Sequence, residues 1–273
     1  MSDFQGANAM SERLTISIVD GIADVRLNRP EKMNALDPAM FEGLAGVLKR
    51  LEEEPELRAI VLSGEGRAFC AGLDMMSFAG MAQSGAPFDI SERTLGKCNL
   101  FQHVAYGWRQ LPVPVITAIH GEAFGGGLQI ASGGDIRIVA PDARLSIMEI
   151  KWGIVPDMGG TVLWRDLVRG DVLRELIYTG RVFSGEDALK YGFATRISAD
   201  PRAEALALAK DIAGRNPDAI RAAKRLFNMT ADWDEAACLL AESGEQAKLM
   251  GTPNQIEAVM ANMEKRPPRF SAA

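Results

Sequence analysis

Two glycine-rich segments, each directly after a short apolar run, most constrain what this chain can fold into. The first, 64–74, follows the run 59–63, and the second, 121–127, follows the run 115–119. Short apolar runs that end in glycine are typical of buried strands, and the chain between them carries helical periodicity. Strands that alternate with helices predict a mainly parallel sheet covered by helices. We therefore expect both glycine-rich turns at the carboxyl ends of neighbouring strands.

Further periodic segments complete this α/β framework. Asp20-Gly21 suits a tight hairpin turn, and Asp37 followed by Pro38 is typical of a helix start. The spacing of apolar residues predicts a hairpin over 14–18 and 22–27, helices over 38–54, 91–110 and 128–132, and strands over 135–140 and 146–149.

The pattern changes after Pro156, where strands give way to helices. Ser184 is a good N-cap, and the segment 198–201, which ends in Asp-Pro, indicates a hinge. The predicted helices are 161–168, 172–178, 185–191 and those of a tail that is helical throughout. We therefore expect a core over residues 1–200 and a helical arm over residues 201–273.

The charge balance excludes several classes of partner. The chain has 30 Lys and Arg against 36 Asp and Glu, which gives a net charge of −6. No overall field therefore attracts nucleic acid or an anionic lipid surface, and an anionic ligand needs a local basic pocket. The longest apolar run, around 113–119, is too short to cross a bilayer, so we expect no membrane association.

Cysteine and histidine usage predicts neither disulfides nor a metal site. The three cysteines, Cys70, Cys98 and Cys238, are widely spaced and form no CxxC pair. This pattern is typical of a reducing compartment, and we expect a cytoplasmic protein. The two histidines, His103 and His120, belong to no HExxH or Cys/His cluster, so we expect no metal.

Each glycine-rich turn can aim a backbone N–H group at a ligand. A phosphate cradle is one possibility, but GxGxxG fails at Ile130 and the chain contains no GxxxxGK[ST]. Two such turns at neighbouring strand ends can instead offer two N–H groups to one carbonyl oxygen, which is an oxyanion hole. A tight turn that binds no ligand is the alternative.

A third stretch, 145–157, contains two carboxylates that can move protons. Glu149 lies between Met148 and Ile150, where desolvation would raise the pKa of its carboxyl toward a value useful for proton transfer. Asp157 follows after a bend that can return it to the same cavity. The alternative is a half-exposed strand glutamate paired with Lys151, and Asp157 as an ordinary cap for the helix that follows.

Four segments occur in the order and spacing of a known family. They are LNRPEKMNAL at 27–36, RAFCAGLD at 67–74, GEAFGGG at 121–127 and TGRVFSGEDA at 179–188. Together they resemble the crotonase superfamily, the enoyl-CoA hydratases and isomerases, over nearly the full chain. The resemblance implies an α/β spiral of ββα units and a C-terminal helical arm that assembles homotrimers or hexamers.

The resemblance also implies the ligand and its contacts. An acyl-CoA substrate would place its thioester carbonyl between the backbone N–H groups of Leu73 and Gly126. Ala71 would lie beside the adenine, and Lys265 would approach the CoA phosphates. Coenzyme A is part of this substrate, so no separate cofactor is expected. The chemistry agrees, because an enolate formed next to a thioester needs two such donors.

Gln129 is the departure from the family pattern. The resemblance places the two glutamates of the hydratases at positions 129 and 149, and a glutamine amide can orient water but cannot take its proton. Asp157 resembles a carboxylate of the dienoyl-CoA isomerases, although those proteins usually carry an acid at position 129. The pattern therefore favours double-bond isomerisation, with Glu149 and Asp157 shifting a proton and Gln129 among the substrate-binding residues.

Several alternatives stay open. Glu149 alone can support hydration, and a CoA-ester-binding homologue without catalysis would also explain Gln129. An RNA-binding relative needs a basic stripe, whereas Arg221, Lys224 and Arg225 form only a small cluster. His103 is either a structural histidine or an additional group near the site. Residues 75–110 are expected to shape the acyl pocket.

Overall fold

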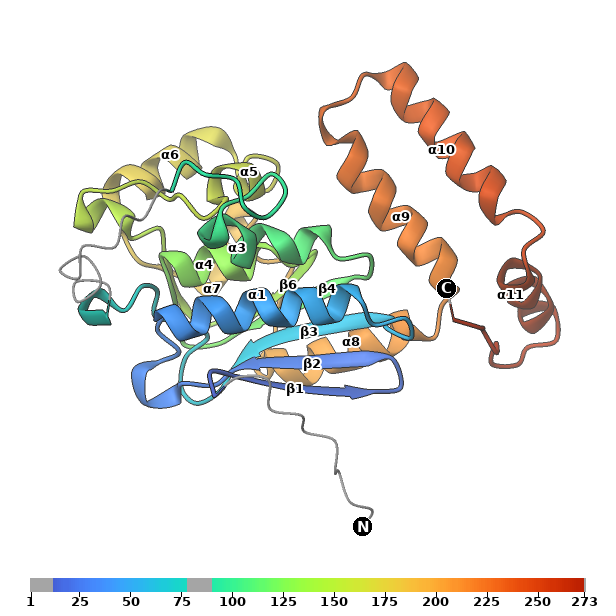
Figure 1. Cartoon of the computed structure of the whole chain (residues 1–273), viewed down its shortest axis with the longest axis horizontal. Coiled ribbons are helices and arrows are strands. Elements are labelled where there is room, and N and C mark those ends of the chain that lie inside the picture. Colours follow the sequence, from blue (N-terminus) through green and yellow to red (C-terminus); the bar gives the residue numbers. More distant parts are fainter. Residues whose placement is uncertain (1–11, 78–89, 273) are drawn as a thin grey trace, which may run out of the picture.

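The strands of the computed structural model, which describes residues 12–77 and 90–272, form two sheets (Figure 1). The larger sheet contains β1 (Leu14–Val19), β2 (Ile22–Leu27), β3 (Ala59–Gly64), β4 (Val115–Ile119), β6 (Ile136–Val139) and β9 (Arg196–Ile197), in that spatial order. The smaller sheet contains β5 (Glu122–Phe124), β7 (Arg144–Ser146) and β8 (Phe183–Ser184).

Strand pairing confirms the predicted hairpin and the mainly parallel sheet. β1 and β2 pair in antiparallel fashion, and every later pair in the larger sheet is parallel. The smaller sheet was not predicted, because β5 lies inside what we expected to be a turn. The predicted strand over 146–149 is wrong: β7 ends at Ser146, and a 3-10 helix, Glu149–Trp152, begins three residues later.

The helices of the described chain follow the expected order with corrected bounds. They are α1 (Pro38–Glu52), α3 (Leu100–Gln110), α4 (Gly126–Ser132), α5 (Gly160–Trp164), α6 (Gly170–Thr179), α7 (Gly185–Tyr191), α8 (Pro201–Ala213), α9 (Pro217–Met229), α10 (Glu235–Leu249) and α11 (Pro253–Met263). The helix predicted over 91–110 starts only at Leu100, because Asn99 and Gln102 form a capping box there. None of the helices described is both long and apolar enough to cross a membrane.

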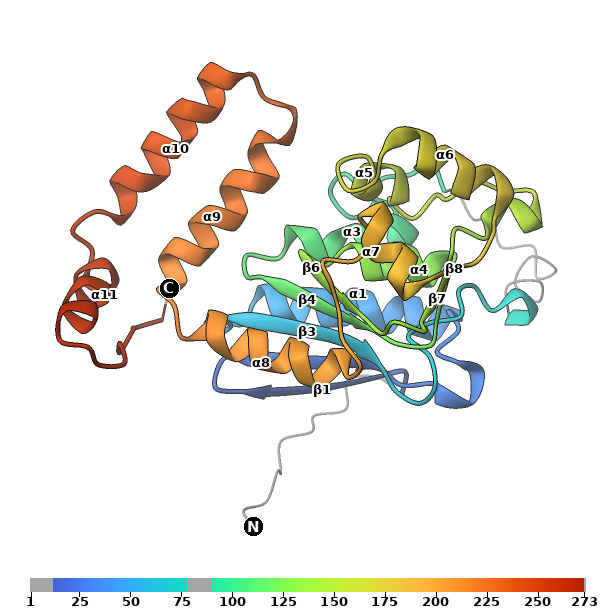
Figure 2. The ribbon, with the colours of Figure 1, turned by 180° about the vertical axis from the view of Figure 1, so that it is seen from behind.

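Helices cover both faces of the larger sheet. On one face α1, α3 and α4 enclose the main hydrophobic core, and on the other face α8 lies along the strands (Figures 1 and 2). Ala205 and Ala209 of α8 pack against Val61, Ile116 and Ile138. This helix, which the sequence assigned to the arm, therefore completes the core.

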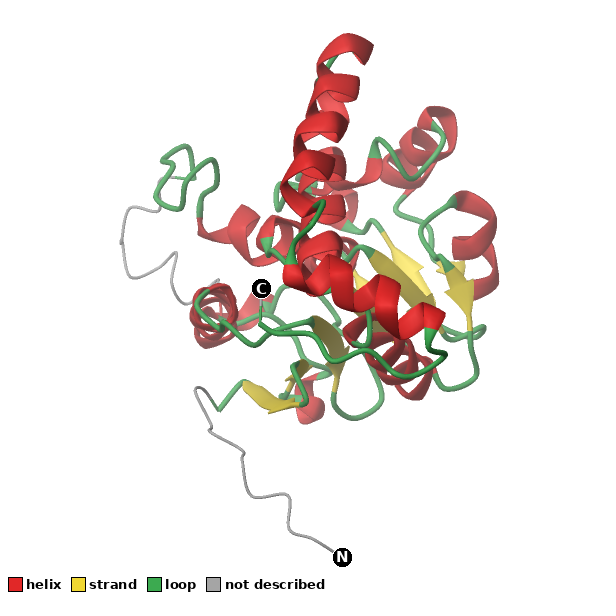
Figure 3. Cartoon of the chain, turned by 90° about the vertical axis from the view of Figure 1, so that its right-hand side faces the viewer, coloured by secondary structure: helices red, strands yellow, loops and turns green. Residues whose placement is uncertain are grey.

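The helices that extend away from the core are α9, α10 and α11, and we call residues 217–272 the terminal arm (Figures 1 and 3). Lys224 of α9 is buried at its base and donates to Asp135 Oδ2 (2.7 Å) and the Val113 carbonyl (2.8 Å). Burial lowers the pKa of the Lys224 ammonium, and the nearby Asp135 carboxylate opposes that effect. This ion pair fixes where the terminal arm leaves the core.

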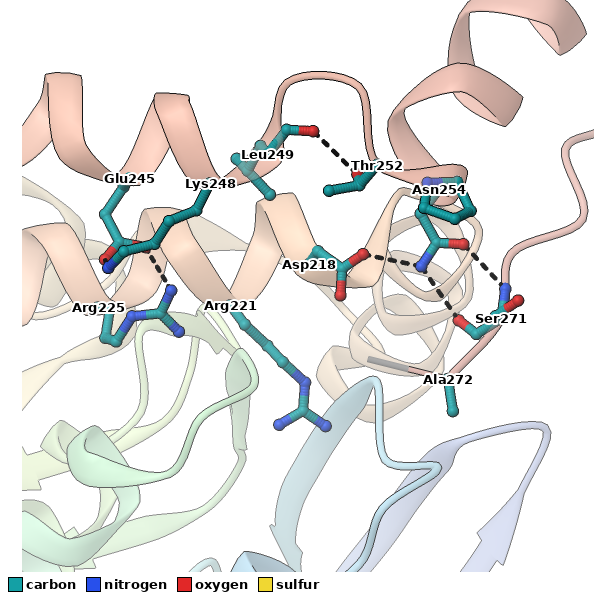
Figure 4. A pocket seen from close by; sticks show the side chains of 11 residues that line it. Asp218, Arg221, Arg225, Glu245, Lys248, Leu249, Thr252, Asn254, Ser271 and Ala272 are labelled. Atoms are coloured by element: carbon teal, nitrogen blue, oxygen red, sulfur yellow. Dashed lines mark hydrogen bonds and ion pairs between the residues drawn. The ribbon is translucent and has the colours of Figure 1, made fainter.

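Residues of the terminal arm line a cavity of about 520 Å³. Figure 4 shows the side chains that line it. Arg225 and Lys248 both pair with Glu245, and Asn254 donates to Asp218 Oδ2 (2.8 Å). These contacts hold α9, α10 and α11 to one another. The cavity shares no lining residue with the segments that carry the predicted catalytic groups.

Candidate functional site

The first glycine-rich turn is held against β5. The Cys70 N–H donates to the Glu122 carbonyl (2.9 Å), and the Phe124 N–H donates to the Cys70 carbonyl (3.0 Å). These two bonds form a parallel bridge between Cys70 and Ala123. The turn that follows β3 therefore runs beside the strand that leads into the second turn.

On its other side the first turn is held by residues 33–36. The Leu36 N–H donates to the Gly72 carbonyl (2.8 Å), and the Asp74 N–H donates to the Leu36 carbonyl (2.9 Å). The Ala71 N–H donates to the Met33 carbonyl (2.9 Å). The N–H of Leu73 has no acceptor among the residues that the structure describes. It therefore stays available to a ligand.

The second donor is the N–H of Gly126, the first residue of α4. The first N–H groups of a helix have no partner within the helix, and none is present for Gly126 in residues 12–77 and 90–272. Gly72, at φ +89°, allows the two turns to meet: a Cβ there would lie 2.7 Å from the Phe124 carbonyl oxygen and 3.8 Å from the Gly126 nitrogen. Leu73 and Gly126 thus lie on neighbouring segments, as an oxyanion hole requires.

Asn34 and Arg29 support the first turn, and the sequence reasoning did not find this role. The buried Asn34 side chain accepts from the Arg29 N–H (2.8 Å) and donates to the carbonyls of Glu65 and Ala68 (both 2.9 Å). Arg29 donates to Asp74 Oδ2 (2.8 Å). Burial alone would raise the pKa of the Asp74 carboxyl, but the hydrogen bonds from Arg29 and Ser77 and the Arg29 charge together outweigh it, so the pKa is lowered. Both residues lie in the segment LNRPEKMNAL, so the signal was polar residues inside a motif.

Glu149 lies beside the second turn. It begins the 3-10 helix after β7 and is only 6% exposed, so the exposed-strand alternative does not hold. A Cβ added at Gly125 would lie 3.5 Å from Glu149 Oε1. Oε1 accepts from Gln129 Nε2 (2.6 Å), whereas the buried Oε2 has no partner in the described chain. A carboxylate oxygen that is buried and unpaired is a group that can accept a proton.

The Gln129 side chain is bonded to protein through both ends of its amide. Its Oε1 accepts from the backbone N–H groups of Met158 (2.9 Å) and Gly160 (3.0 Å). These donors fix which end of the amide is oxygen, so that Nε2 faces Glu149. The predicted contact between Gln129 and substrate stays a prediction.

Asp157 precedes the segment that Gln129 anchors. The residue reaches solvent, and Gly159 rather than Asp157 is the N-cap of α5. Burial raises the pKa of Glu149, and the Asp157 charge raises it further, while hydrogen bonds from the backbone and Gln129 oppose the shift. Partial desolvation also raises the pKa of Asp157. The two carboxyl groups therefore interact and are both shifted toward values useful in proton transfer.

Two of the predicted contacts with CoA differ in how the structure supports them. Ala71 is half-buried two residues before Leu73 and so lies at the first turn. Lys265 is exposed just after α11, and α11 lies at the opposite end of the molecule from α5 and α6 (Figures 1 and 2). One chain therefore does not bring Lys265 to Glu149.

The remaining candidate groups lie in structural positions. Burial raises the pKa of the Cys70 thiol to about 12, and the thiol donates to the Asn34 carbonyl (3.1 Å), so no thiolate nucleophile forms at neutral pH. His103 lies on α3 against Leu48 of α1, where burial lowers its pKa. Within the described ranges no three His, Cys, Asp or Glu side chains are grouped to hold a metal ion. Residues 78–89 of the expected acyl-pocket segment lie outside the described residues.

A mainly parallel sheet covered by helices, two adjacent glycine-rich turns and a buried carboxylate after β7 agree with the crotonase fold of the solved structures that this chain resembles. The chain belongs to the enoyl-CoA hydratase/isomerase family, whose model matches residues 17–273.

Relatives and solved structures match over nearly the whole chain. It is 34% identical over 265 residues to "Probable enoyl-CoA hydratase echA6" of Mycobacterium leprae, covering 94% of this chain and 99% of that protein. It is 31% identical to the mitochondrial methylglutaconyl-CoA hydratase of Mus musculus, covering 92% and 79%. The crystal structure of an enoyl-CoA hydratase from Bacillus anthracis superimposes with a TM-score of 0.86 at 30% identity, covering 94% and 98%.

Proposed function

We propose that this family member isomerises the double bond of an enoyl- or dienoyl-CoA ester by proton transfer. The observation that carries the proposal is that Glu149 is buried beside the second turn with Oε2 unpaired in the described chain, and the Asp157 charge adds to the rise of its pKa. A glutamate at position 129 could help to hold and activate water, whereas this chain has a glutamine there whose amide is bonded to protein.

The proposed mechanism uses only groups of this chain and the substrate. One carboxylate removes a proton from the acyl carbon chain, and the electron pair moves toward the thioester oxygen to give a conjugated enolate. The N–H groups of Leu73 and Gly126 stabilise that oxygen, each contributing about 3 kcal/mol in comparable sites. When the electrons return, the second carboxyl gives a proton to another carbon, and the double bond has moved.

Hydration by Glu149 alone is the second candidate. The relatives are named mostly as hydratases, which supports this reading over a specialised isomerase. Glu149 Oε2 is buried and unpaired in the described chain, so it can take a proton from a water molecule. A CoA-ester-binding protein without catalysis is the third candidate, and turnover of any substrate excludes it.

The proposal includes how CoA is held and how the chains assemble. Coenzyme A enters as part of the substrate, with Ala71 beside its adenine. Because Lys265 lies far from Glu149 in one chain, we propose that a neighbouring copy in a homotrimer or hexamer presents Lys265 to the CoA phosphates. The cysteines Cys70, Cys98 and Cys238 are free, as expected of a chain that works in the cytoplasm.

The deciding experiment is a panel of enoyl- and dienoyl-CoA esters in heavy water. We expect deuterium uptake into the acyl chain and migration of the double bond, with no hydroxyl product. A 3-hydroxyacyl-CoA product would overturn the isomerase proposal in favour of hydration. Tight binding of every ester without exchange, migration or hydration would favour the protein without catalysis.

A further inference from the structure

We infer that Gln129 is a positioning residue, whose side-chain amide holds Glu149 with one oxygen free and anchors the peptide that follows Asp157. The inference rests on the proposed function, because it concerns the same two carboxylates. It differs from the expectation that Gln129 contacts substrate or water.

The amide oxygen of Gln129 has no capacity left for a ligand. A side-chain amide oxygen has two lone pairs, and here both accept backbone N–H groups, from Met158 (2.9 Å) and Gly160 (3.0 Å). An acceptor for water or for a substrate hydroxyl is therefore absent from this side chain. What the oxygen does instead is fix the segment that begins directly after Asp157.

The amide nitrogen of Gln129 orients the Glu149 carboxylate. Nε2 donates to Glu149 Oε1 (2.6 Å), and Oε2 is left buried and unpaired in the described chain. A single donor to one oxygen fixes the plane of a carboxylate and leaves the second oxygen for chemistry. Gln129 thereby links α4, the 3-10 helix and the Asp157 segment through one side chain.

The surroundings of Gln129 match this role. Gln129 lies on α4 only three residues after Gly126, so one short helix carries both an enolate donor and the group that orients Glu149. A Cβ at Gly160 would lie 2.8 Å from Gln129 Oε1 and 2.6 Å from the Trp164 ring. A glycine at position 160 therefore lets the amide approach the backbone.

The charge of Glu149 depends on this donor. An N–H donated to a carboxylate favours its ionised form, whereas a glutamate at position 129 would set two carboxyls at hydrogen-bond distance that must share a proton. Helices α4 and α5 carry no titratable side chain. Lys151 lies on the same 3-10 helix as Glu149, and Asp157 lies in the loop that follows it. Helix α6, which contacts the 3-10 helix, carries Asp171, Arg174 and Glu175.

Gln129→Glu is the main test, because it keeps the oxygen that Met158 and Gly160 need and replaces the neutral N–H donor to Glu149 with a carboxyl that becomes negative once the shared proton is lost. The rate of deuterium exchange into an enoyl-CoA ester is measured against pH. We expect the rising limb of the profile to move up by about one pH unit or more and kcat near neutral pH to fall about tenfold, with KM within about twofold. Gln129→Met, which removes both ends of the amide, should lower kcat by about 100-fold.

The matched control is Ser132→Ala on the same helix. Ser132 accepts from Trp164 Nε1 (2.8 Å), so its loss perturbs the contact between α4 and α5 without touching Glu149. We expect a lower Tm and a wild-type pH profile.

A wild-type profile and kcat in Gln129→Glu would overturn the inference, as would a profile that moves equally in Ser132→Ala. Glu149→Gln distinguishes failure of the proposed function from failure of the positioning role. If Glu149→Gln keeps its turnover, the proposed function fails. If Glu149→Gln is inactive but the pH profile of Gln129→Glu does not shift, only the positioning role is refuted.

Discussion

In the core, Gln129 and Glu149 are buried and tie together segments that are far apart in sequence. In the terminal arm, Glu245 of α10 pairs with Arg225 of the preceding helix and with Lys248 of its own helix. Each hydrogen bond around Gln129 fixes a group that the chemistry needs. Glu245 is buried, but its partners Arg225 and Lys248 are largely exposed, so solvent screens these pairs and limits what they contribute to stability. In the proposed mechanism, the polar groups of the core therefore position reacting groups, whereas those of the arm hold its helices together.

The core and the terminal arm also differ in how they bury apolar side chains. The core buries many of its large apolar residues, including Trp108 and Trp164 at 0% exposure, and those it leaves exposed include Trp152 and Val155 in the segment that follows Glu149. The arm leaves many uncovered, among them Phe227, Leu239, Leu240, Ile256, Val259, Met260 and Met263. An apolar surface of this kind is typical of an interface, which supports the proposal that another copy of the chain packs on the arm. The following predictions test this division.

Glu149→Gln should have the largest effect. The substitution keeps the shape of the side chain and a hydrogen bond to Gln129 but removes the proton acceptor. We expect turnover to fall by at least about 1000-fold while CoA-ester binding changes little. Stopped-flow turnover and isothermal titration measure the two quantities. Near-normal turnover would mean that the buried core carboxylate is structural, and the comparison with the arm would lose its basis.

The fold was largely predictable, because its signals are local. The Asp37 cap, the Asp20-Gly21 turn and the apolar runs of β3 and β4 each depend on neighbouring residues, and the structure has all of them. The strand expected at 146–149 was wrong, because the structure there depends on residues far away in the sequence. Burial of Glu149 comes from α4 and the loop before α5, which no spacing within 145–157 can show.

The parts of the candidate site that lie within one segment were predictable, whereas the bonds between segments were not. The turns that contain Leu73 and Gly126 follow from glycine spacing, and the structure brings them side by side. The bonds from Asn34 to the first turn and from Gln129 to Met158 join residues about 30 positions apart, so they become visible only after folding. The position of Lys265 depends on the course of the arm.

Gly72→Ala should have the next largest effect. At φ +89°, and with its Cβ only 2.7 Å from the Phe124 carbonyl oxygen, alanine must push the first turn away from β5. Loss of the aligned Leu73 donor should lower kcat about 100-fold, near 3 kcal/mol of transition-state stabilisation.

Gly46→Ala in α1 is the control for the same chemical change. A Cβ at Gly46 meets no atom within 4 Å, so alanine should raise the free energy of unfolding by about 0.5–1 kcal/mol and leave kcat unchanged. If Gly72→Ala retains wild-type kcat, the two turns do not form the enolate site.

Charges on the arm should break assembly with a smaller effect on chemistry. Leu239 and Leu240 on α10 are 63% and 75% exposed, and replacing both with Asp should prevent their burial against another copy. Sedimentation should show the wild type as a trimer or hexamer and the variant as a smaller species. Gln246→Asp, on an exposed polar position of the same helix, should keep the wild-type mass. A doubly charged variant of wild-type mass would show that another surface makes the interface.

The smallest expected effect is on how the free energy of unfolding changes with pH. The sign of that change distinguishes a functional carboxylate from a structural one. Because the pKa of Glu149 is raised in the folded state, the folded chain binds more protons than the unfolded chain between the unfolded pKa, about 4.3, and the folded pKa. Stability contributed by protonated Glu149 is therefore present below the unfolded pKa and is lost as pH rises through the folded pKa. Glu149→Gln should then be more stable than the wild type near neutral pH, with an advantage that disappears below about pH 4. Urea unfolding near neutral pH and below about pH 4 measures the difference in stability between Glu149→Gln and the wild type. Glu42→Gln, on the exposed face of α1, is the control. A difference that widens on acidification would show that the site stabilises the carboxylate of Glu149 rather than its protonated form.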